Sequence, residues 1–161
     1  MVAMAVALEP AVLLADEPTS SLDVTVQAQV LELLASLIAE TQMAMVLITH
    51  NLAVAVGMAH RIAVMYAGRI VELGPARAVF SDPKHPYTAA LLRSIPDIQV
   101  REKRLPAITG APPNLLRPPT GCAFHPRCPL ADDRCRAEVP PDVEVRPGRW
   151  SACFHPDEVT W

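Results

Sequence analysis

The sequence has no glycine before Gly57 and few aromatic side chains. A phosphate-binding loop of the form G-x-x-x-x-G-K-[ST] is absent from all 161 residues. Aromatic residues make up only 4% of the chain, which favours a core of alanine, valine, leucine and isoleucine. At this length we expect one domain with an appendage.

Other absences narrow the class of protein further. Glu9 and Asp16 interrupt the longest apolar runs, so no run is long enough to span a membrane. The apolar N-terminus has no basic leader, which argues against a signal peptide. The net charge is −3, so we expect no nucleic-acid partner. These absences favour a cytosolic protein whose membrane contact goes through a partner.

What the sequence does contain is an apolar run, residues 12–15, that ends in two adjacent carboxylates, Asp16 and Glu17. Buried charges are costly unless they are paired or hold a metal. The carboxyl ends of parallel strands are where α/β sheets bind ligands. In nucleotide hydrolases an Asp at this place holds Mg²⁺, and a neighbouring Glu can accept a proton from an attacking water. His50 ends a second apolar run, residues 43–49, and it reaches the same edge as Glu17 if the two strands are neighbours.

These residues match one family of sequences. LLADEPTSSLD, residues 13–23, resembles the Walker B segment and D-loop of ATP-binding-cassette (ABC) ATPases, and LITHNL, residues 47–52, resembles their switch-histidine segment. The resemblance continues through residues 61–74 and His-Pro-Tyr at 85–87 to the cysteine-bearing tail. This combination is similar to the ATP-binding subunits of oligopeptide and dipeptide ABC importers. Asn51 departs from the family, which usually has Asp there.

The resemblance implies an ATPase that uses ATP and Mg²⁺. In it, Asp16 holds the magnesium, Glu17 is the general base and His50 contacts the γ-phosphate. Ser21 and Asp23 belong to the D-loop, which faces a second ABC ATPase subunit across a dimer interface. The other implied partners are transmembrane permease subunits and, indirectly, a peptide-binding protein. The chain is then peripheral at the inner face of the cell membrane, and the transported substrate is set by the permease and the binding protein.

Because the chain begins where such a subunit is just past its signature motif, we interpret it as the C-terminal half of a larger ATPase, from a fragment or a truncated gene. We expect it to hydrolyse ATP poorly or not at all by itself. One alternative is a stand-alone metal-binding or regulatory protein on a truncated ATPase scaffold. Another is a DNA-repair or translation ATPase of the same superfamily, against which the charge balance and the tail argue.

The predicted fold class is α/β, a partial P-loop NTPase-like domain of parallel strands and helices. Residues 1–95 form this ATPase part, residues 96–120 a proline-rich linker, and residues 121–161 a cysteine-rich extension with too few apolar residues for a core of its own. We expect helices at 1–8, 24–41, 52–59, 75–80 and 87–95, and fully buried strands at 12–15 and 43–49. Asp23 is the expected cap of the second helix, and Ala67-Gly68 predicts a hairpin between strands 62–66 and 69–73.

The four cysteines, Cys122, Cys128, Cys135 and Cys153, all lie in the extension. No pair has the two-residue gap that is usual in zinc ribbons. Four thiolates suit an iron–sulfur cluster, and Pro129 follows Cys128 as in ferredoxin-type runs.

We expect three neighbouring arginines to favour the thiolate forms: Arg127, Arg134 and Arg136. The resemblance adds that the peptide-importer ATPases carry a cysteine-rich segment that can hold a 4Fe–4S cluster. Zinc, disulfides and free thiols remain the alternatives. His125 and His155 are either spare ligands or surface residues, and we assign no chemistry to His60 and His85.

Overall fold

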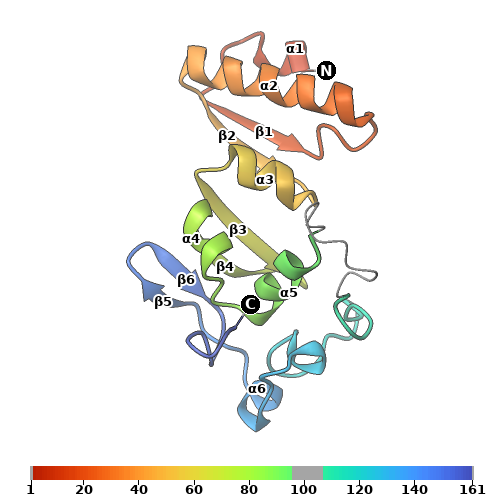
Figure 1. Ribbon diagram of the computed structural model, residues 1–161, viewed down its shortest axis with the longest axis vertical. Coiled ribbons are helices and arrows are strands. Elements are labelled where there is room, and N and C mark those ends of the chain that lie inside the picture. Colours follow the sequence, from red (N-terminus) through yellow and green to blue (C-terminus); the bar gives the residue numbers. More distant parts are fainter. Residues whose placement is uncertain (1, 96–106, 161) are drawn as a thin grey trace. The chain divides into compact units, whose positions relative to one another are not determined.

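The computed structural model describes residues 2–95 and 107–160. The chain divides into two compact units, Met1–Met58 and Ala59–Trp161. Both units combine helices with a small sheet, so the α/β class is confirmed at this level (Figure 1). No helix in the described ranges is long and apolar enough to cross a membrane.

The first unit is built on two parallel strands. Its elements are α1 (Val2–Val6), β1 (Val12–Asp16), α2 (Val24–Thr41), β2 (Ala44–Ile48) and α3 (Leu52–Met58). The strands pair in register from Val12 opposite Ala44 to Asp16 opposite Ile48. The two strands are therefore neighbours, which is the condition under which His50 reaches the same edge as Glu17.

Helix α2 packs its apolar side on one face of this sheet. The buried cluster there consists of Leu13, Leu34 and Met43. The prediction of fully buried strands was wrong, because the side chains of Val12 and Leu14 on the opposite face are 58% and 66% exposed. A two-stranded sheet has only one face against α2, so its alternate side chains face solvent.

The start of α2 is fixed by Asp23, as predicted. Its Oδ1 accepts the backbone N–H groups of Thr25 and Val26, both at 3.0 Å, which satisfies two of the free donors at a helix N-terminus. The helix ends at Gln42, which adopts the left-handed conformation with φ 55°. Some apolar residues of α2 are not buried: Val26 and Leu33 are 37% and 51% exposed, because the contact stripe is narrower than the run of apolar residues.

The second unit contains an antiparallel sheet in the order β3-β4-β6-β5. Its elements are β3 (Arg61–Tyr66), β4 (Arg69–Pro75), α4 (Ala76–Ser81), α5 (Pro86–Arg93), the 3₁₀ turn η1 (His125–Arg127), α6 (Asp133–Ala137), β5 (Val143–Arg146) and β6 (Arg149–Ser151). The predicted β3–β4 hairpin is confirmed, with Ala67 at φ 49° and Gly68 at φ 79° in its turn.

The cysteine-rich tail is part of this unit and not a separate body. Strand β6 pairs with β4, with Leu73 opposite Trp150, and Phe124 is buried in the core beside Tyr66 and Val79. The tail therefore takes its core from the sheet that precedes it. The compact units divide after Met58, whereas the sequence led us to expect divisions after residues 95 and 120. Residues 96–106 of the predicted linker lie outside the described residues.

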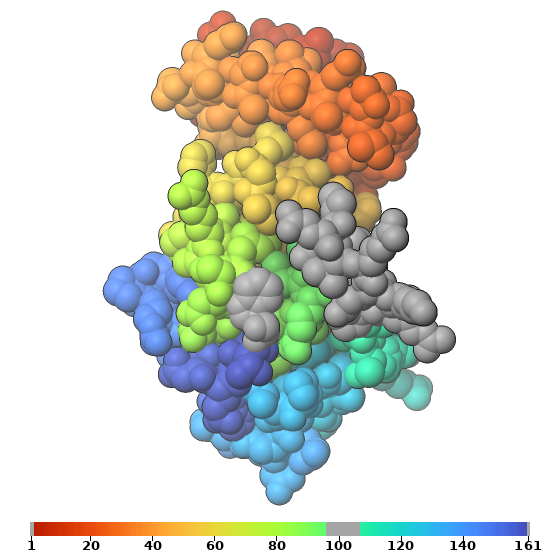
Figure 2. Space-filling model, viewed as in Figure 1, coloured from red at the N-terminus to blue at the C-terminus, as the bar shows by residue number. Residues whose placement is uncertain are grey.

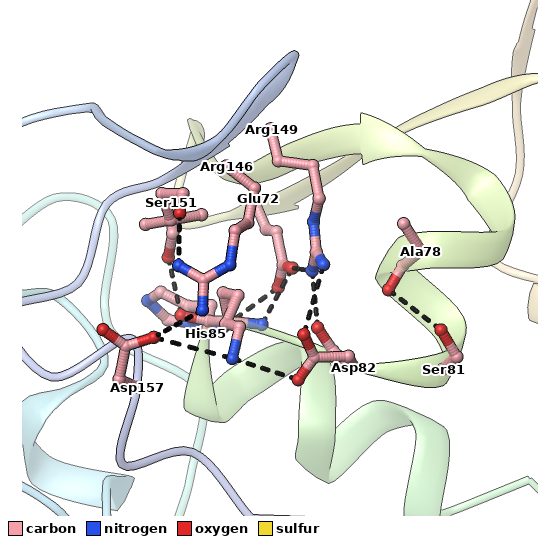
Figure 3. A network of polar contacts seen from close by, with 11 residues as sticks. Glu72, Ala78, Ser81, Asp82, His85, Arg146, Arg149, Ser151 and Asp157 are labelled. Carbon is pink, nitrogen blue, oxygen red and sulfur yellow. Dashed lines mark hydrogen bonds and ion pairs between the residues drawn. The ribbon is translucent and has the colours of Figure 1, made fainter.

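A buried carboxylate, Glu72 on β4, connects β4, β6 and the loop before α5 (Figure 3). Its Oε1 accepts the Lys84 backbone N–H at 2.8 Å and the Arg149 Nη2 at 3.0 Å, and its Oε2 accepts the His85 N–H at 3.0 Å. Glu72 is 1% exposed and Arg149 is 5% exposed. Gly74 is required beside them, because a Cβ there would come within 2.8 Å of the Arg149 Cγ.

Asp82 and Ser151 complete this polar network. Figure 3 shows the Arg149 guanidinium between Glu72 and Asp82, whose backbone oxygen also accepts from it. The Ser151 hydroxyl donates to the Lys84 carbonyl at 2.7 Å, and the Lys84 Nζ lies 3.0 Å from Asp82. Burial raises the pKa of Glu72, and its hydrogen bonds and Arg149 oppose that rise.

His85 is a packing and capping residue, in line with the sequence analysis, which gave it no chemistry. Its side chain is 1% exposed, and its Nδ1 accepts the Tyr87 N–H at 3.0 Å at the start of α5. A ring that accepts at Nδ1 must be neutral. Burial lowers the pKa of His85 to about 4.

We predict that His85 makes the free energy of unfolding fall in acid. Above pH 6.5 the ring is neutral in both the folded and unfolded chain. Between about pH 6.5 and 4, only the unfolded chain takes up the proton, so stability declines as pH falls, by up to about 3 kcal/mol. His85→Asn keeps an acceptor near the Tyr87 N–H but cannot titrate. Denaturant unfolding of both proteins from pH 4 to 8 should give a difference that shrinks toward pH 4, and parallel curves would contradict the prediction.

Candidate functional site

The carboxyl edge of the parallel pair gathers the residues predicted for catalysis. Asp16 is the last residue of β1 and lies opposite Ile48, the last residue of β2. Glu17 and His50 follow these strands directly, one residue and two residues beyond their ends. The register of the sheet thus brings two segments that are 33 residues apart in sequence to one place.

Glu17 and His50 form a direct hydrogen bond. The His50 Nδ1 lies 2.7 Å from the Glu17 Oε1, and the two side chains are 77% and 41% exposed. The Glu17 backbone has φ 43°, and its N–H donates to the Ile48 carbonyl at 2.9 Å. Positive φ is uncommon for a residue with a Cβ and is concentrated at functional sites. Glu17 adopts a positive φ here because the chain turns sharply after β1 while the Glu17 N–H stays bonded to β2.

This arrangement can support acid–base chemistry on a ligand at the sheet edge. A carboxylate can accept a proton, and an imidazole bonded to it can orient it or contact a charged group. Asp16 supplies a second exposed carboxylate at the same edge, and carboxylates are preferred ligands of Mg²⁺. The structure brings Glu17 and His50 into contact and places Asp16 next to Glu17 at the end of β1.

The turn after Glu17 presents the other predicted residues. Thr19 is buried, with 9% exposure, and its carbonyl accepts the Leu22 N–H at 3.1 Å. Ser21 is exposed, and Asp23 is occupied in capping α2. The turn is therefore a tight connection with an outward polar surface.

Asn51 has a local role that the sequence analysis did not assign. Its Oδ1 accepts the N–H groups of Ala53 at 3.1 Å and Val54 at 3.4 Å, so it caps α3. The cap could have been predicted from the sequence, because Asn is a preferred N-cap residue and Asn51 directly precedes an apolar helix. The cap fixes the direction in which the chain leaves His50.

The four cysteines surround one small cavity in the second unit. Cys122, Cys128, Cys135 and Cys153 line it together with Phe124, His85 and His155. Figure 2 shows the dark-blue C-terminal residues packed beside the lighter-blue residues that carry the first three cysteines. Gly121 has φ 69° and abuts α6, which allows the Cys122 N–H to donate to the Cys135 carbonyl at 2.8 Å.

Two of the sulfurs accept backbone hydrogen bonds from the residue two positions later. The His155 N–H lies 3.3 Å from the Cys153 Sγ, and the Leu130 N–H bonds to Cys128. Hydrogen bonds of this kind stabilise sulfur when it carries negative charge. In the apo protein, burial first and the neighbouring thiols second raise the pKa of Cys128 to about 11 and of Cys153 to about 12.

The expectation that nearby arginines favour the thiolates was wrong. The Arg127 guanidinium donates to the carbonyls of Ile108 and Thr109, at 3.2 and 2.9 Å. Arg134 stacks on the Phe154 ring at 4.0 Å from its centre. Arg136 pairs with an aspartate on its own helix. The arginines are held by other partners, and burial is the main cause that raises the pKa values of Cys128, Cys135 and Cys153.

A group that the sequence analysis did not assemble lies at one side of the thiol cavity. Ligand atoms of Asp132, Cys135 and His155 all lie within 4.8 Å of one another, the one such group of three among residues 2–95 and 107–160. No three of the four thiols come that close in the same ranges. Sequence spacing did not predict this group, because Asp132 and His155 are 23 residues apart in the sequence.

Comparison with known proteins bears on both sites. Residues 71–135 match the family model described as the oligopeptide/dipeptide transporter, C-terminal region. This match covers β4 from Val71 onward, Glu72, α5 and three of the four cysteines, whereas Arg149 and Ser151 of the Glu72 network lie beyond it.

Curated relatives extend the similarity over nearly the whole chain. The dipeptide transport ATP-binding protein DppD of Escherichia coli is 51% identical over 156 residues, which are 97% of this chain and 48% of that protein. The oligopeptide transport ATP-binding protein OppD of E. coli is 49% identical over 98% of this chain and 47% of its own length. A probable peptide ABC transporter ATP-binding protein, y4tS of Sinorhizobium fredii, is 54% identical over 94% of this chain and 43% of its own length. The chain spans about half the length of these relatives, and it is similar to these peptide ABC transporter ATP-binding proteins over nearly all of its own length.

Proposed function

We propose that this chain is the C-terminal half of an ATP-hydrolysing subunit that powers peptide import through an ABC transporter. The observation that carries the proposal is the Glu17–His50 contact at the carboxyl edge of two parallel strands. The names of its relatives, dipeptide and oligopeptide transport ATP-binding proteins, supply the substrate class. None of these names supports a stand-alone metal-binding protein or a nucleic-acid ATPase.

In this proposal each residue of the edge has one task. Asp16 holds the Mg²⁺ that accompanies ATP. Glu17 takes the proton of the attacking water, and His50 contacts the γ-phosphate and keeps the Glu17 carboxylate in position through the 2.7 Å hydrogen bond. Glu17 adopts the left-handed backbone conformation directly after the strand end, and its side chain is 41% exposed, so the carboxylate is accessible to a ligand.

The polar turn faces a partner. Ser21 and Asp23 lie in the D-loop, which we assign to the interface with a second ABC ATPase subunit. Asp23 serves this role indirectly, since it anchors the turn to α2 through its two backbone hydrogen bonds. The complete protein then works on the inner face of the membrane with transmembrane permease subunits, and a peptide-binding protein acts upstream of them.

We predict that the purified chain alone shows no ATP turnover above background. Catalysis of phosphoryl transfer is mostly positioning and charge stabilisation, and the sequence holds no G-x-x-x-x-G-K-[ST] loop to cradle the phosphates. Steady-state phosphate release with Mg²⁺ measures it. Robust release that Glu17→Gln abolishes would contradict this prediction.

We predict that Glu17→Gln traps ATP in a complete subunit. A chimera supplies one: residues 2–160 of this chain replace the matching part of E. coli DppD, to which they are 51% identical. Loss of a general base costs about 100- to 10,000-fold in turnover. ATP binding should persist, and His50→Ala should also bind nucleotide while losing nearly all hydrolysis.

The matched control for this experiment is Glu40→Gln in the same chimera. Glu40 is an exposed glutamate on α2, so its substitution removes the same charge from the same unit. Its turnover should equal that of the parent chimera. Near-normal turnover of Glu17→Gln would show that the base is another residue.

We also propose that the four thiols hold a metal centre, with a 4Fe–4S cluster as the first choice and zinc as the second. The fit rests on the shared cavity, on the two N–H···S contacts and on the exclusion of water by Phe124 and His85. A tetrahedral zinc with bonds of about 2.3 Å would need sulfurs about 3.8 Å apart, whereas a cluster accepts the wider spacing found here. When bound, the group would cross-link α6, the residues on either side of η1 and the segment that follows β6.

We predict that anaerobically prepared chain carries iron and acid-labile sulfide in about equal amounts, about four of each per chain. Cys128→Ser should lose both. Chemical assay of iron and sulfide, together with the visible absorption of the cluster, measures the outcome. Stoichiometric zinc without sulfide would replace the cluster by a zinc site, and metal-free protein with an ordered tail would reject both.

A further inference from the structure

We propose that Asp132, Cys135 and His155 form a binding site for a single divalent ion of the zinc class, distinct from the four-thiol centre. The three side chains offer one oxygen, one sulfur and one nitrogen ligand, all within 4.8 Å of one another. Mixed sets of this kind suit Zn²⁺ and Co²⁺. The site needs neither ATP nor the other cysteines, and it shares Cys135 with the proposed cluster, so one chain holds either the ion or the cluster.

The contacts of His155 carry this inference. Its Nδ1 lies 3.0 Å from the Glu158 Oε1, and its Nε2 lies 3.1 Å from the Asp132 Oδ2. A neutral imidazole can donate from only one nitrogen. If that donor serves Glu158, the other nitrogen presents a lone pair to a carboxylate oxygen. A metal ion bound to this nitrogen and to the Asp132 Oδ2 would take the place of the proton that otherwise bridges the two atoms.

The pattern matches the outer shell of known metal sites. A histidine that binds a metal usually donates its second ring N–H to a carboxylate, which fixes the tautomer and the ring orientation. Glu158 is that carboxylate here. Two ligands on tetrahedral zinc, with bonds of about 2.0 to 2.1 Å, lie about 3.3 Å apart. The observed 3.1 Å between the His155 and Asp132 atoms is close to this spacing.

The other two ligands are also held in place. The Asp132 Oδ1 caps α6 by accepting the Cys135 N–H at 2.8 Å, which leaves Oδ2 for an ion. Cys135 is 6% exposed, so its sulfur is shielded from water. The side chain of Asp132 is 46% exposed, so an ion can enter from solvent on that side. On binding, the Cys135 proton passes to solvent and the thiolate becomes the ligand.

The experiment is a Co²⁺ titration of reduced, chelator-treated chain, followed by cobalt absorption bands. In a Cys122→Ser, Cys128→Ser variant the four-thiol centre is gone, yet Co²⁺ should still bind with a thiolate charge-transfer band and tetrahedral d–d bands. Adding His155→Ala should lower the affinity for Co²⁺ further. Loss of an outer-shell partner costs about 10- to 100-fold in affinity, and the loss of His155 should cost more than that. Glu158→Gln should weaken it by about that outer-shell amount.

His125→Ala is the matched control, because His125 also lines the thiol cavity, but its Nδ1 bonds to the Cys122 carbonyl and it is not one of the three proposed ligands. It should leave Co²⁺ affinity unchanged. If the double cysteine variant does not fold, His125→Ala and His155→Ala are compared in the chain with all four cysteines. Equal affinities there, or loss of Co²⁺ binding in a folded double variant, would overturn the inference. Loss of Co²⁺ binding in the folded double variant would assign the binding to the four thiols. If no variant and no parent chain binds Co²⁺, a proton and not a metal ion bridges His155 and Asp132.

Discussion

The second unit depends on one buried ion pair, Glu72 with Arg149. Taking two charges out of water costs several kcal/mol for each, and only close pairing with further hydrogen bonds offsets that cost. Here the carboxylate receives two backbone N–H groups and a guanidinium, and these donors come from the loop before α5 and from β6. Since the donors belong to two different segments, the pair fixes where α5 begins and where the C-terminal strand docks. The ion pair therefore also positions the proposed metal ligands that follow β6.

The two candidate sites differ in how they are positioned. Glu17 and His50 sit on the edge of a small sheet and are held by strand register and one backbone hydrogen bond, so they remain open to a ligand. The thiols sit in a closed cavity, on short elements that contain little regular structure. A site of the first kind suits a substrate that binds and leaves. A site of the second kind suits a resident group that stabilises its own surroundings.

The elements that were predicted correctly are those that local sequence patterns indicate. The helix from Val24 to Thr41, its Asp23 cap and the Ala67-Gly68 turn follow from spacing, capping and turn preferences, and all three were found. Strands β5 and β6 were missed because they are short and depend on distant pairing: Leu73 of β4 pairs with Trp150 of β6, and β5 in turn pairs with β6. No local pattern reveals a partner that far away in the sequence. The arginine prediction failed for a related reason: proximity in sequence does not say which carbonyl or ring a guanidinium will find. Glu72 could not be recognised as buried, because a single acid in an alternating strand looks like a solvent-facing residue.

The uncovered face of the β1–β2 sheet has a consequence for handling the protein. Val12, Leu14, Val46 and Ile48 form a contiguous apolar surface, and each is at least 47% exposed. Such a surface beside open strand edges attracts other copies, because burying it releases ordered water and supplies partners for unpaired backbone groups. Solubility should therefore fall steeply with concentration and improve with cooling, since the hydrophobic attraction weakens as temperature drops. Aggregation through the first unit would then limit how long a preparation lasts, while the second unit stays folded.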